Sequence, residues 1–408
     1  MTSSDQPPDP VPPVYPMKRV CPVDPPSEYA RFRDEQPLTR IRLWDDSEAW
    51  LATRYQDVRQ ILFDPRFSIM PSRPGFPFVS ASRASMLKGE KHNFAFMDPP
   101  QHTGLRRMLT PMFTVKRIAE MAPAIERIVK ELIDAVEASG PPVDLVEAFA
   151  LPLPSLVIAD LLGVPYEDHG FFQECARQRV DLTVAPEVSL AAGDRIFDYL
   201  DRLLRRIEAD PGDGSTLLSR LATEHILPGH LAHEDAVGMA RVLLLAGHDT
   251  TATQIGAGML ALLQNPQQLQ ELITDDALIP GAVEEMLRYA TIAHHNAPRV
   301  AIQDVEIGGQ TIRAGEGVIA SLPAANRDPA TFPDPDRFDI HRKAHHHVAF
   351  AFGPHQCLGQ ALARLELQIA FRGLLKRLPT LRLAVPAEEL RFKLESMTCG
   401  VLALPVAW

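Results

Sequence analysis

The sequence predicts a mainly α-helical protein with small β-sheets, organised as a single continuous domain over residues 1–408. Three observations support this fold class. The periodicity is helical from about Val115 to Gln268, strand-like alternation is confined to short segments, and no internal repeat or Gly/Ser linker divides the chain. A chain of this length usually forms two domains, but these features favour one domain that can enclose a bulky ligand.

The N-terminal segment carries proline and strand signals. Residues 1–16 contain too many prolines for a helix or a sheet ladder, and they predict an extended arm. The stretch PLTRIRLWDDSEAWLATRY alternates with period two around Asp45–Asp46, which predicts a β-hairpin. From Gln56 the pattern becomes helical.

The later elements follow from periodicity and stop signals. In chain order we expect a long helix over Glu234–Leu263 that ends before Asn265–Pro266, a helix over Pro280–Tyr289, two short strands around Gly308–Gly309, an irregular loop over Asn326–Asp339, a helix from Cys357 to about Leu378, and short strands in residues 381–406.

The composition argues against nucleic acid or an anionic membrane as the main partner. Acidic residues outnumber basic ones by 52 to 41, and the formal net charge is −11. No apolar run approaches the ~20 residues that cross a bilayer, no secretory segment is recognisable, and the four cysteines show no framework spacing. We therefore expect a reduced, cytoplasmic protein without a membrane anchor.

Cys357 stands in FAFGPHQCLGQALARLE, after a Gly-Pro turn and before a run with helical spacing. A helix that starts at the cysteine would direct unpaired N–H groups and its positive dipole end at the sulfur, which favours the thiolate. A lone cysteine is usually a small core residue, the interpretation we keep for Cys21, Cys175 and Cys399. For Cys357 the alternatives are a packing residue, a nucleophile and a metal ligand, and packing fits the turn and helix start poorly.

The polar stretch AGHDTT interrupts the most apolar predicted helix. Asp249 and Thr250 are poor residues for a buried helix centre, because a polar group loses free energy on burial unless it finds a partner. If Thr250 bonds the carbonyl of Ala246, four residues back, the helix opens locally. The result would be a polar notch beside a cavity, suited to a diatomic molecule and water; the alternative is an exposed polar stripe.

Two further clusters are weak signals when each is taken singly. Glu285 and Arg288 lie three residues apart in EEMLR, which ordinarily makes a surface pair, and Arg337 in PDPDRF could complete a buried network with them. In DPPQHTGLRR, His102 and Arg106 lie one helical turn apart on the same face. Together with two residues from later in the chain they could gather around an anion; the four are His102, Arg106, Arg299 and His355.

Together these motifs resemble the cytochrome P450 heme-thiolate monooxygenases, in their soluble bacterial branch. The patterns FxxGxxxCxG around Cys357, AGxDTT, ExxR, the PxRF arginine and HxxxR occur in the family's order and spacing, from about Tyr15 to the C-terminus. One such motif is moderate evidence, whereas five in order are very specific. Ala351 departs from the pattern, since most relatives carry glycine there.

The resemblance implies a cytochrome P450 fold whose helices and small sheets enclose heme b (iron protoporphyrin IX). Cys357 would be the axial ligand of the heme iron. Asp249 and Thr250 would organise water and deliver protons during dioxygen activation. The loop before the cysteine would be fixed by a structural triad of Glu285, Arg288 and Arg337. The heme propionates would be held by His102, Arg106, Arg299 and His355.

The same resemblance places substrate contacts in residues 73–96, in Leu182–Ala185, in Ile292–Ala297 and in Met397–Thr398, as well as on the long helix. The pocket residues predicted individually are Phe94, Leu243, Ala246, Ile292, His294 and Met397. His294 and His295 form an unusual pair, and each can either contact substrate or point into solvent.

The chain is too short for a fused flavin or iron–sulfur domain, so the resemblance implies electrons from a separate acidic ferredoxin and its ferredoxin reductase. We expect a monomer that takes O2 and a hydrophobic small molecule. Docking on the thiolate side would use a basic patch, the alternative being an ordinary solvated surface. Its candidate residues are Arg107, Lys116, Arg117, Arg342, Lys343 and Arg364.

Three functional hypotheses remain in order of preference. The first is a ferredoxin-dependent monooxygenase that hydroxylates or epoxidises a hydrophobic metabolite, in secondary metabolism. The second is an NADH-dependent nitric oxide reductase of the same fold, which SRPGFPFVSAS also resembles. The third is a non-catalytic heme sensor. The pair Asp249–Thr250 favours the first hypothesis, because neither alternative needs a proton relay of this kind.

Overall fold

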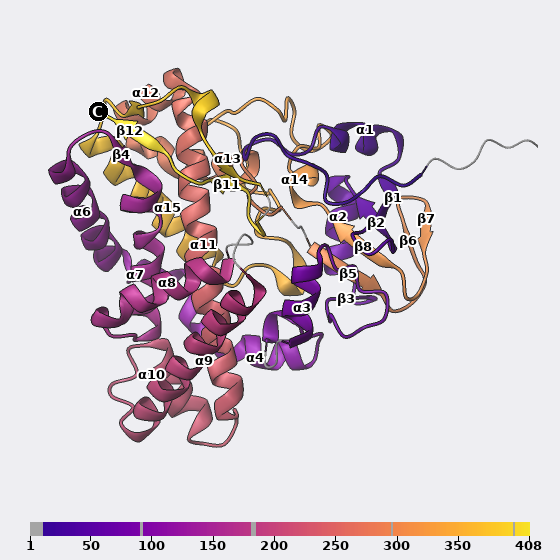
Figure 1. Cartoon of the computed structure of the whole chain (residues 1–408), viewed down its shortest axis with the longest axis horizontal. Coiled ribbons are helices and arrows are strands. Elements are labelled where there is room, and N and C mark those ends of the chain that lie inside the picture. Colours follow the sequence, from indigo (N-terminus) through magenta and orange to yellow (C-terminus); the bar gives the residue numbers. More distant parts are fainter. Residues whose placement is uncertain (1–10, 90–92, 181–184, 295–296, 395) are drawn as a thin grey trace, which may run out of the picture.

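The computed structural model describes residues 11–89, 93–180, 185–294, 297–394 and 396–408. Its helices (Figure 1) are α1 Glu28–Glu35, α2 Tyr55–Phe63, α3 Ala81–Gly89, α4 Gln101–Leu109, α5 Val115–Ala119, α6 Ala122–Ser139, α7 Pro152–Leu162, α8 His169–Val180, α9 Pro186–Ala209, α10 Leu217–Leu221, α11 His233–Leu263, α12 Pro266–Thr274, α13 Ile279–Tyr289, α14 Leu322–Ala325 and α15 Gln360–Arg377. Its strands are β1 Leu38–Arg42, β2 Glu48–Ala52, β3 Phe67–Ser68, β4 Val143–Asp144, β5 Ala297–Ala301, β6 Val305–Ile307, β7 Gln310–Ile312, β8 Gly317–Ala320, β9 Arg382–Leu383, β10 Phe392–Lys393, β11 Gly400–Val401 and β12 Pro405–Ala407. The mainly α-helical prediction is confirmed.

Helix α11 runs through the middle of the helical part of the molecule (Figure 1). Helices α7, α9, α13 and α15 pack against it. Every residue from Thr251 to Leu262 is buried, because this stretch is apolar on nearly all faces and such a helix can be surrounded by others. The neighbouring helices therefore hold α11 in place, and α11 carries the site residues between Ala246 and Gln254.

The largest sheet has five strands in the order β1-β2-β8-β5-β3. The predicted hairpin forms one edge of it, with β1 antiparallel to β2 and Arg40 opposite Trp50. Strand β2 pairs in parallel with β8, and β8 pairs in turn with β5, which places Arg299 opposite Val318. The sheet thus ties the N-terminal hairpin to the segment that carries Arg299.

Most of the other predicted elements are confirmed with small shifts at their ends. The helix predicted over Glu234–Leu263 is α11, which starts one residue earlier, and that over Pro280–Tyr289 is α13. Gly308 and Gly309 connect β6 to β7 with φ values of 54° and 80°, the left-handed conformations that a tight hairpin turn requires.

The N-terminal arm is anchored along the hairpin where it is described. The Tyr15 N–H donates to the carbonyl of Arg42 at 2.8 Å, and the Tyr15 side chain is buried. The first part of the predicted arm, residues 1–10, lies outside the described residues.

The helix after Cys357 begins later than predicted. Helix α15 starts at Gln360, and a single 3₁₀ turn, η7 Gly353–His355, precedes the cysteine. The backbone of Gln356 between them is extended, with ψ of 141°, and this conformation interrupts the helical path. Cys357 therefore lies in a short loop between two helical segments rather than at the first turn of a helix.

Two apolar cores meet beside this loop. The larger core belongs to the helices and includes Leu243 and Leu362, and the smaller core lies on the five-stranded sheet and includes Leu322. A cavity of about 510 Å³ is lined by residues of both cores, these three among them. The cavity therefore lies where the helical and sheet-containing parts of the molecule join.

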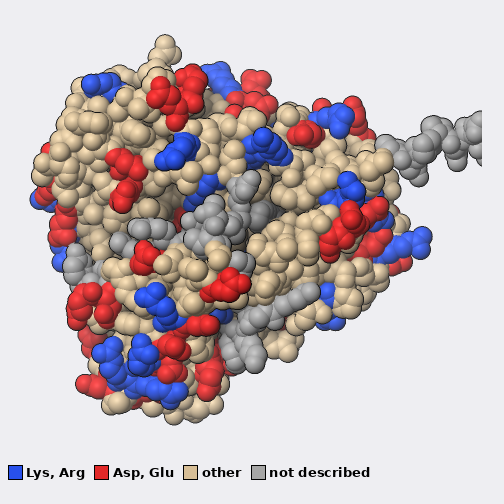
Figure 2. All heavy atoms as spheres, in the orientation of Figure 1, with Lys and Arg blue, Asp and Glu red and all other residues tan. Residues whose placement is uncertain are grey.

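Charged side chains of both signs are interspersed over the face shown in Figure 2, without a continuous basic stripe. This distribution agrees with the modest negative net charge of −11. Among the described helices, none has the length and apolar character needed to span a membrane.

Candidate active site

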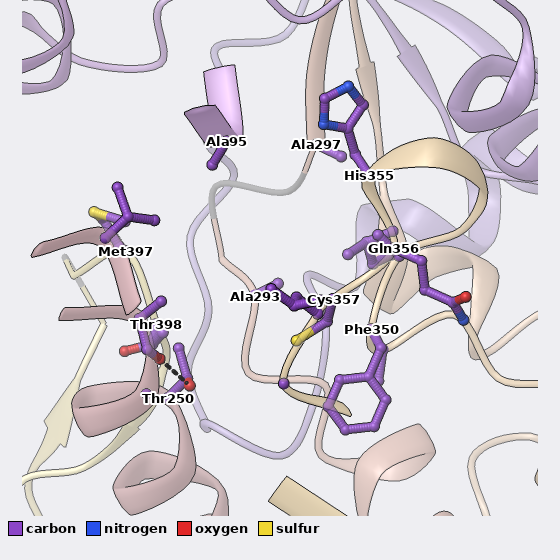
Figure 3. Close-up of a pocket in the computed structure, with 18 of the residues that line it drawn as sticks. Ala95, Thr250, Ala293, Ala297, Phe350, His355, Gln356, Cys357, Met397 and Thr398 are labelled. Atoms are coloured by element: carbon purple, nitrogen blue, oxygen red, sulfur yellow. Dashed lines mark hydrogen bonds between the residues drawn. The ribbon is translucent and has the colours of Figure 1, made fainter. Parts of the chain in front are cut away.

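The cavity is lined mainly by apolar side chains, and Thr250 and Cys357 lie on opposite sides of it (Figure 3). Met397 and Thr398 are on the Thr250 side, whereas His355 is on the Cys357 side. Its volume of about 510 Å³ lies within the range of ~300–1,000 Å³ that is usual for small-molecule sites.

The loop before Cys357 follows a narrowly determined path. Gly353 has a φ of +76°, and a Cβ there would lie 2.8 Å from the carbonyl oxygen of Leu62, so this close approach requires glycine. The Cys357 N–H donates to the carbonyl of Phe350 at 2.9 Å. Arg106 donates to the carbonyl that immediately precedes the cysteine, at 2.6 Å. These contacts fix where the sulfur lies.

The environment of Cys357 favours the thiol in the absence of a metal. Among the four cysteines only Cys357 is exposed, because its side chain faces the cavity. Enclosure by the surrounding protein still raises the pKa of this thiol above 9.0, and the Gly359 N–H, Arg106 and Arg364 offset only part of the increase. The start of the following helix therefore does not stabilise the thiolate as predicted. A bound metal cation would stabilise it, since a thiol that coordinates a metal is deprotonated.

The four predicted anion-binding residues come together at the edge of the cavity. His102 and Arg106 extend from α4, Arg299 from β5 and His355 from η7, and the rings of His102 and His355 stack at 3.9 Å. Burial and the neighbouring cations lower the pKa of His102 to about 4 and that of His355 to about 3. Burial also lowers the pKa of Arg299 to about 10.

The cluster has donors that no described anion satisfies in full. His102 Nδ1 is buried and has no hydrogen-bond partner among the described residues. Arg299 is 3% exposed and donates to the carbonyl of Pro298. The nearby carboxylate of Asp98 raises the pKa of Arg299 and so offsets part of the effect of burial. A ligand with two carboxylates would satisfy such donors, and Cys357 lines the same cavity. The residues present therefore fit heme, which needs both propionate partners and an axial ligand.

The predicted notch in α11 is present, but only one of its two polar residues faces the cavity. Thr250 Oγ1 donates to the carbonyl of Ala246 at 2.7 Å, and both residues line the cavity. Asp249 does not line it. Its two carboxylate oxygens instead bind Lys393 Nζ and Thr398 Oγ1, each at 2.7 Å.

A buried ion-pair network surrounds Glu285. Both oxygens of this fully buried carboxylate accept from Arg288 at 2.7 Å, and Arg342 lies 3.3 Å from one of them. The prediction that Arg337 is the third side chain is wrong. Arg337 is exposed, because the adjacent Phe338 takes the inward position, and its backbone carbonyl accepts from both arginines.

Of the residues predicted to form the substrate pocket, five line the cavity: Phe94, Leu243, Ala246, Ile292 and Met397. His294 does not, and that prediction is wrong. Ala293 forms a β-bridge with Thr398 and faces the cavity, so the next residue along the chain points the other way and is buried. His295 and residues 182–184 lie outside the described residues.

Glu366 on α15 is a site residue that the sequence interpretation missed. It lines the cavity, it is 3% exposed, and its Oε2 has no hydrogen-bond partner among the described residues. Burial raises the pKa of Glu366 to about 8, so the carboxyl is mostly protonated at neutral pH. The signal was an acidic residue between Leu362 and Ile369, inside an apolar helical stripe.

Comparisons with known proteins agree with this site. A family model described as Cytochrome P450 matches residues 183–402. The chain is 50% identical over 388 residues to Cytochrome P450-SU2 of Streptomyces griseolus, covering 95% of this chain and 94% of that protein. It is 46% identical to pentalenic acid synthase of Streptomyces avermitilis, covering 97% of this chain and 98% of that protein.

Solved structures share the whole architecture. The crystal structure of mycinamicin VIII C21 methyl hydroxylase MycCI from Micromonospora griseorubida, bound to mycinamicin VIII, matches with a TM-score of 0.91 and 42% identity. That match covers 97% of this chain and 100% of the other. With matches of this extent and a cavity that joins a cysteine to four basic residues, the chain belongs to the cytochrome P450 family and is a heme-dependent monooxygenase.

Proposed function

We propose that this enzyme hydroxylates or epoxidises a hydrophobic small molecule of secondary metabolism, as a monomer that takes electrons from a separate ferredoxin and ferredoxin reductase. The observation that carries the proposal is a cavity that has Cys357 on one side and Thr250 with an apolar wall on the other. When bound there, heme supplies reductive activation of dioxygen, by which one oxygen atom enters the substrate and the other leaves as water.

The chain's own residues would bind the heme and would position the water and the proton donor at the cavity. Cys357 would ligate the iron through its sulfur. The propionates would be held by the four basic residues His102, Arg106, Arg299 and His355. Thr250 would exchange its bond to the Ala246 carbonyl for a water molecule, and so hold a proton donor at the cavity. Asp249 would supply protons to that water once its carboxylate is free to turn toward it.

The hydrophobic substrate is supported by the lining and by the names of the relatives. Aromatic rings from the 73–96 segment and from the 3₁₀ turn that follows α4 line the cavity: Phe76, Phe78, Phe94, Phe96 and Phe113. A relative is named pentalenic acid synthase, and a solved relative is bound to mycinamicin VIII. A screen of microbial metabolites for substrate-induced shifts of the Soret absorption would identify the compound class.

The predicted ferredoxin patch needs revision. Arg117 pairs with Glu120, and Arg342 and Arg364 bind the buried carboxylates of α13, at 3.3 and 2.7 Å. We therefore assign docking to the exposed cations, Arg107, Lys116 and Lys343. Replacing these three by glutamate should raise the KM for ferredoxin at least several-fold and leave substrate-induced spectral shifts unchanged, which steady-state kinetics at varied ferredoxin concentration would measure.

The role of Cys357 has a direct spectroscopic test. The reduced, carbon monoxide-treated protein should show the red-shifted Soret band of the heme-thiolate family, and Cys357→Ser should lose it. A band that is absent from the natural protein, or that persists in the variant, would contradict the assignment. Nitric oxide reduction makes a different prediction: rapid consumption of nitric oxide with NADH and without ferredoxin. That outcome would replace the monooxygenase proposal.

A further inference from the structure

Asp249 is held by a part of the chain far from it in sequence. Lys393 Nζ lies 2.7 Å from Asp249 Oδ1, and Thr398 Oγ1 donates to Asp249 Oδ2 at 2.7 Å. Both oxygens of the carboxylate are thus engaged, and the side chain of Asp249 is only 9% exposed. Asp249 does not line the cavity, although Thr250 beside it does.

The two partners belong to the hairpin β10–β11 and the segment between its strands, which pack closely on α11. Lys393 lies opposite Gly400 in the hairpin, and a Cβ at Gly400 would lie 2.5 Å from Thr253 Cγ2 on α11. Thr398 Oγ1 is 3.5 Å from Thr253 Oγ1. The fit of the hairpin on the helix therefore depends on this glycine, and it sets where Lys393 and Thr398 reach Asp249.

The same segment is also part of the substrate wall. Met397 and Thr398 line the cavity. The segment is joined to the stretch that follows α13 by the isolated β-bridge between Ala293 and Thr398 and by the bond from the Cys399 N–H to the Ile292 carbonyl at 2.8 Å. A molecule that presses on residues 397–398 therefore presses on a residue that binds Asp249.

The electrostatic surroundings keep Asp249 ionised. Burial by itself would raise the pKa of Asp249, but the ion pair with Lys393, the hydrogen bond from Thr398 and the nearby His248 outweigh it, so the pKa lies below 3.8. An ionised carboxylate that is bonded to a lysine carries no proton to deliver. Proton delivery at the cavity requires that this arrangement first be broken.

We propose that Lys393 and Thr398 are positioning residues that latch Asp249 away from the cavity, and that substrate contact with residues 397–398 opens this latch. The proposal rests on the proposed monooxygenase function. Once released, the carboxylate takes a proton from water and passes it to the water held by Thr250, so each proton delivered comes from solvent. No proton is delivered efficiently while the substrate is absent.

The first test measures the latch without any turnover. Thermal unfolding would be compared for the natural protein, Lys393→Met, Asp249→Asn and the double variant. Lys393→Met leaves a buried carboxylate without its cation, so it should lower Tm by about 3–5 °C, and the loss should shrink to less than half in the Asp249→Asn background. Lys130→Met is the matched control, because Lys130 also lies 2.7 Å from its partner, Asp134, but that pair is on the surface.

The second test measures the release. Without the latch, heme-loaded Lys393→Met should consume NADH in the absence of substrate about tenfold faster than the natural enzyme and form hydrogen peroxide, in the presence of a surrogate ferredoxin and reductase. Its pH profile for this consumption should shift toward higher pH, because Asp249 loses the cation that stabilises its charge. Lys393→Arg should restore the slow rate, and Lys130→Met should not change it.

Several outcomes would overturn the latch. Tm losses that add fully in the double variant would show that Lys393 and Asp249 do not interact. Substrate-free NADH consumption that stays unchanged or falls in Lys393→Met would show that the pair is merely structural. If Lys393→Met does not fold, Thr398→Val removes the second contact and should give the same acceleration. If no variant consumes NADH, the proposed function fails, while the unfolding comparison still reports on the latch.

Discussion

Ala351 occupies a backbone conformation that favours glycine, and this explains why the family pattern has glycine at that position; nothing in the structure explains the alanine. Its φ is +59°, and its N–H donates to the carbonyl of Val348 at 2.9 Å. A residue with a Cβ loses about 1–2 kcal/mol in this region, whereas glycine adopts it freely. The strain lies six residues before Cys357, in a turn that the surrounding hydrogen bonds maintain.

Replacing Ala351 by glycine should therefore stabilise the fold. We expect Ala351→Gly to raise the free energy of unfolding by about 0.5–1 kcal/mol, since relief of strain exceeds the added freedom of the unfolded chain. Denaturant unfolding would measure it. Ala135→Gly, at an exposed position in α6, is the control and should instead lower stability by about 1 kcal/mol. Equal losses in the two variants would show that Ala351 is not strained.

Glu366 should make stability depend on pH in a defined direction. Burial raises its pKa from 4.5 to about 8, so the folded state binds a proton that the unfolded state releases above pH 4.5. The folded state is favoured most below pH 4.5, and this advantage is lost as the pH rises to about 8. Glu366→Gln removes the titration, so its stability relative to the natural protein should grow by a few kcal/mol across this window. Unfolding at several pH values would measure the trend, with the exposed Glu131→Gln as a control that stays flat.

At the scale of elements, the Glu285 network joins α13 to the loop that leads toward Cys357. Glu285 is the only carboxylate that the described residues place against both Arg288 and Arg342. Glu285→Gln should lower the free energy of unfolding by about 3–5 kcal/mol, because two enclosed guanidinium groups lose their counter-charge. Arg342→Met should also destabilise the protein, whereas Arg337→Met should change stability by less than about 0.5 kcal/mol. If Arg337→Met lowered the free energy of unfolding as much as Arg342→Met, the predicted triad with Arg337 as its third member would be supported instead.

Elements with local signals could be predicted from the sequence, and contacts across the chain could not. Periodicity was sufficient to predict α11 and the body of α15 but not the first residue of α15, and glycine and proline were sufficient to mark the turn before Cys357. The choice of Arg342 over Arg337 depends on how the connecting loop bends, which no local pattern encodes. The orientation of Asp249 depends on Lys393, whose position in space is set by the fit of a hairpin on a helix.

At the scale of the molecule, the four basic residues connect parts that have separate cores. α4 belongs to the helical core, β5 belongs to the five-stranded sheet, and η7 precedes the cysteine. A dianionic group bound by all of them would join these parts electrostatically as well as through the cavity wall. We therefore propose that the predicted single domain over residues 1–408 unfolds as one unit when heme is bound.

Removing one of these cations should separate heme binding from folding. Arg299 is enclosed, and burial lowers its pKa to about 10, so in the heme-free protein its charge is a cost rather than a gain. Arg299→Met should leave the heme-free Tm unchanged or raise it, yet weaken heme binding by about ten- to a hundredfold, as expected for one charge-assisted hydrogen bond of ~1.5–3 kcal/mol. The Tm gain on heme loading should shrink accordingly, because ligand binding stabilises the folded state in proportion to RT ln(1 + [L]/Kd).

Calorimetry with and without heme would measure both quantities. The control is Arg107→Met, at an exposed position on helix α4, which also carries His102 and Arg106, and it should leave both quantities unchanged. Equal Tm losses in the two forms of Arg299→Met would show that the residue serves the fold and not the propionates.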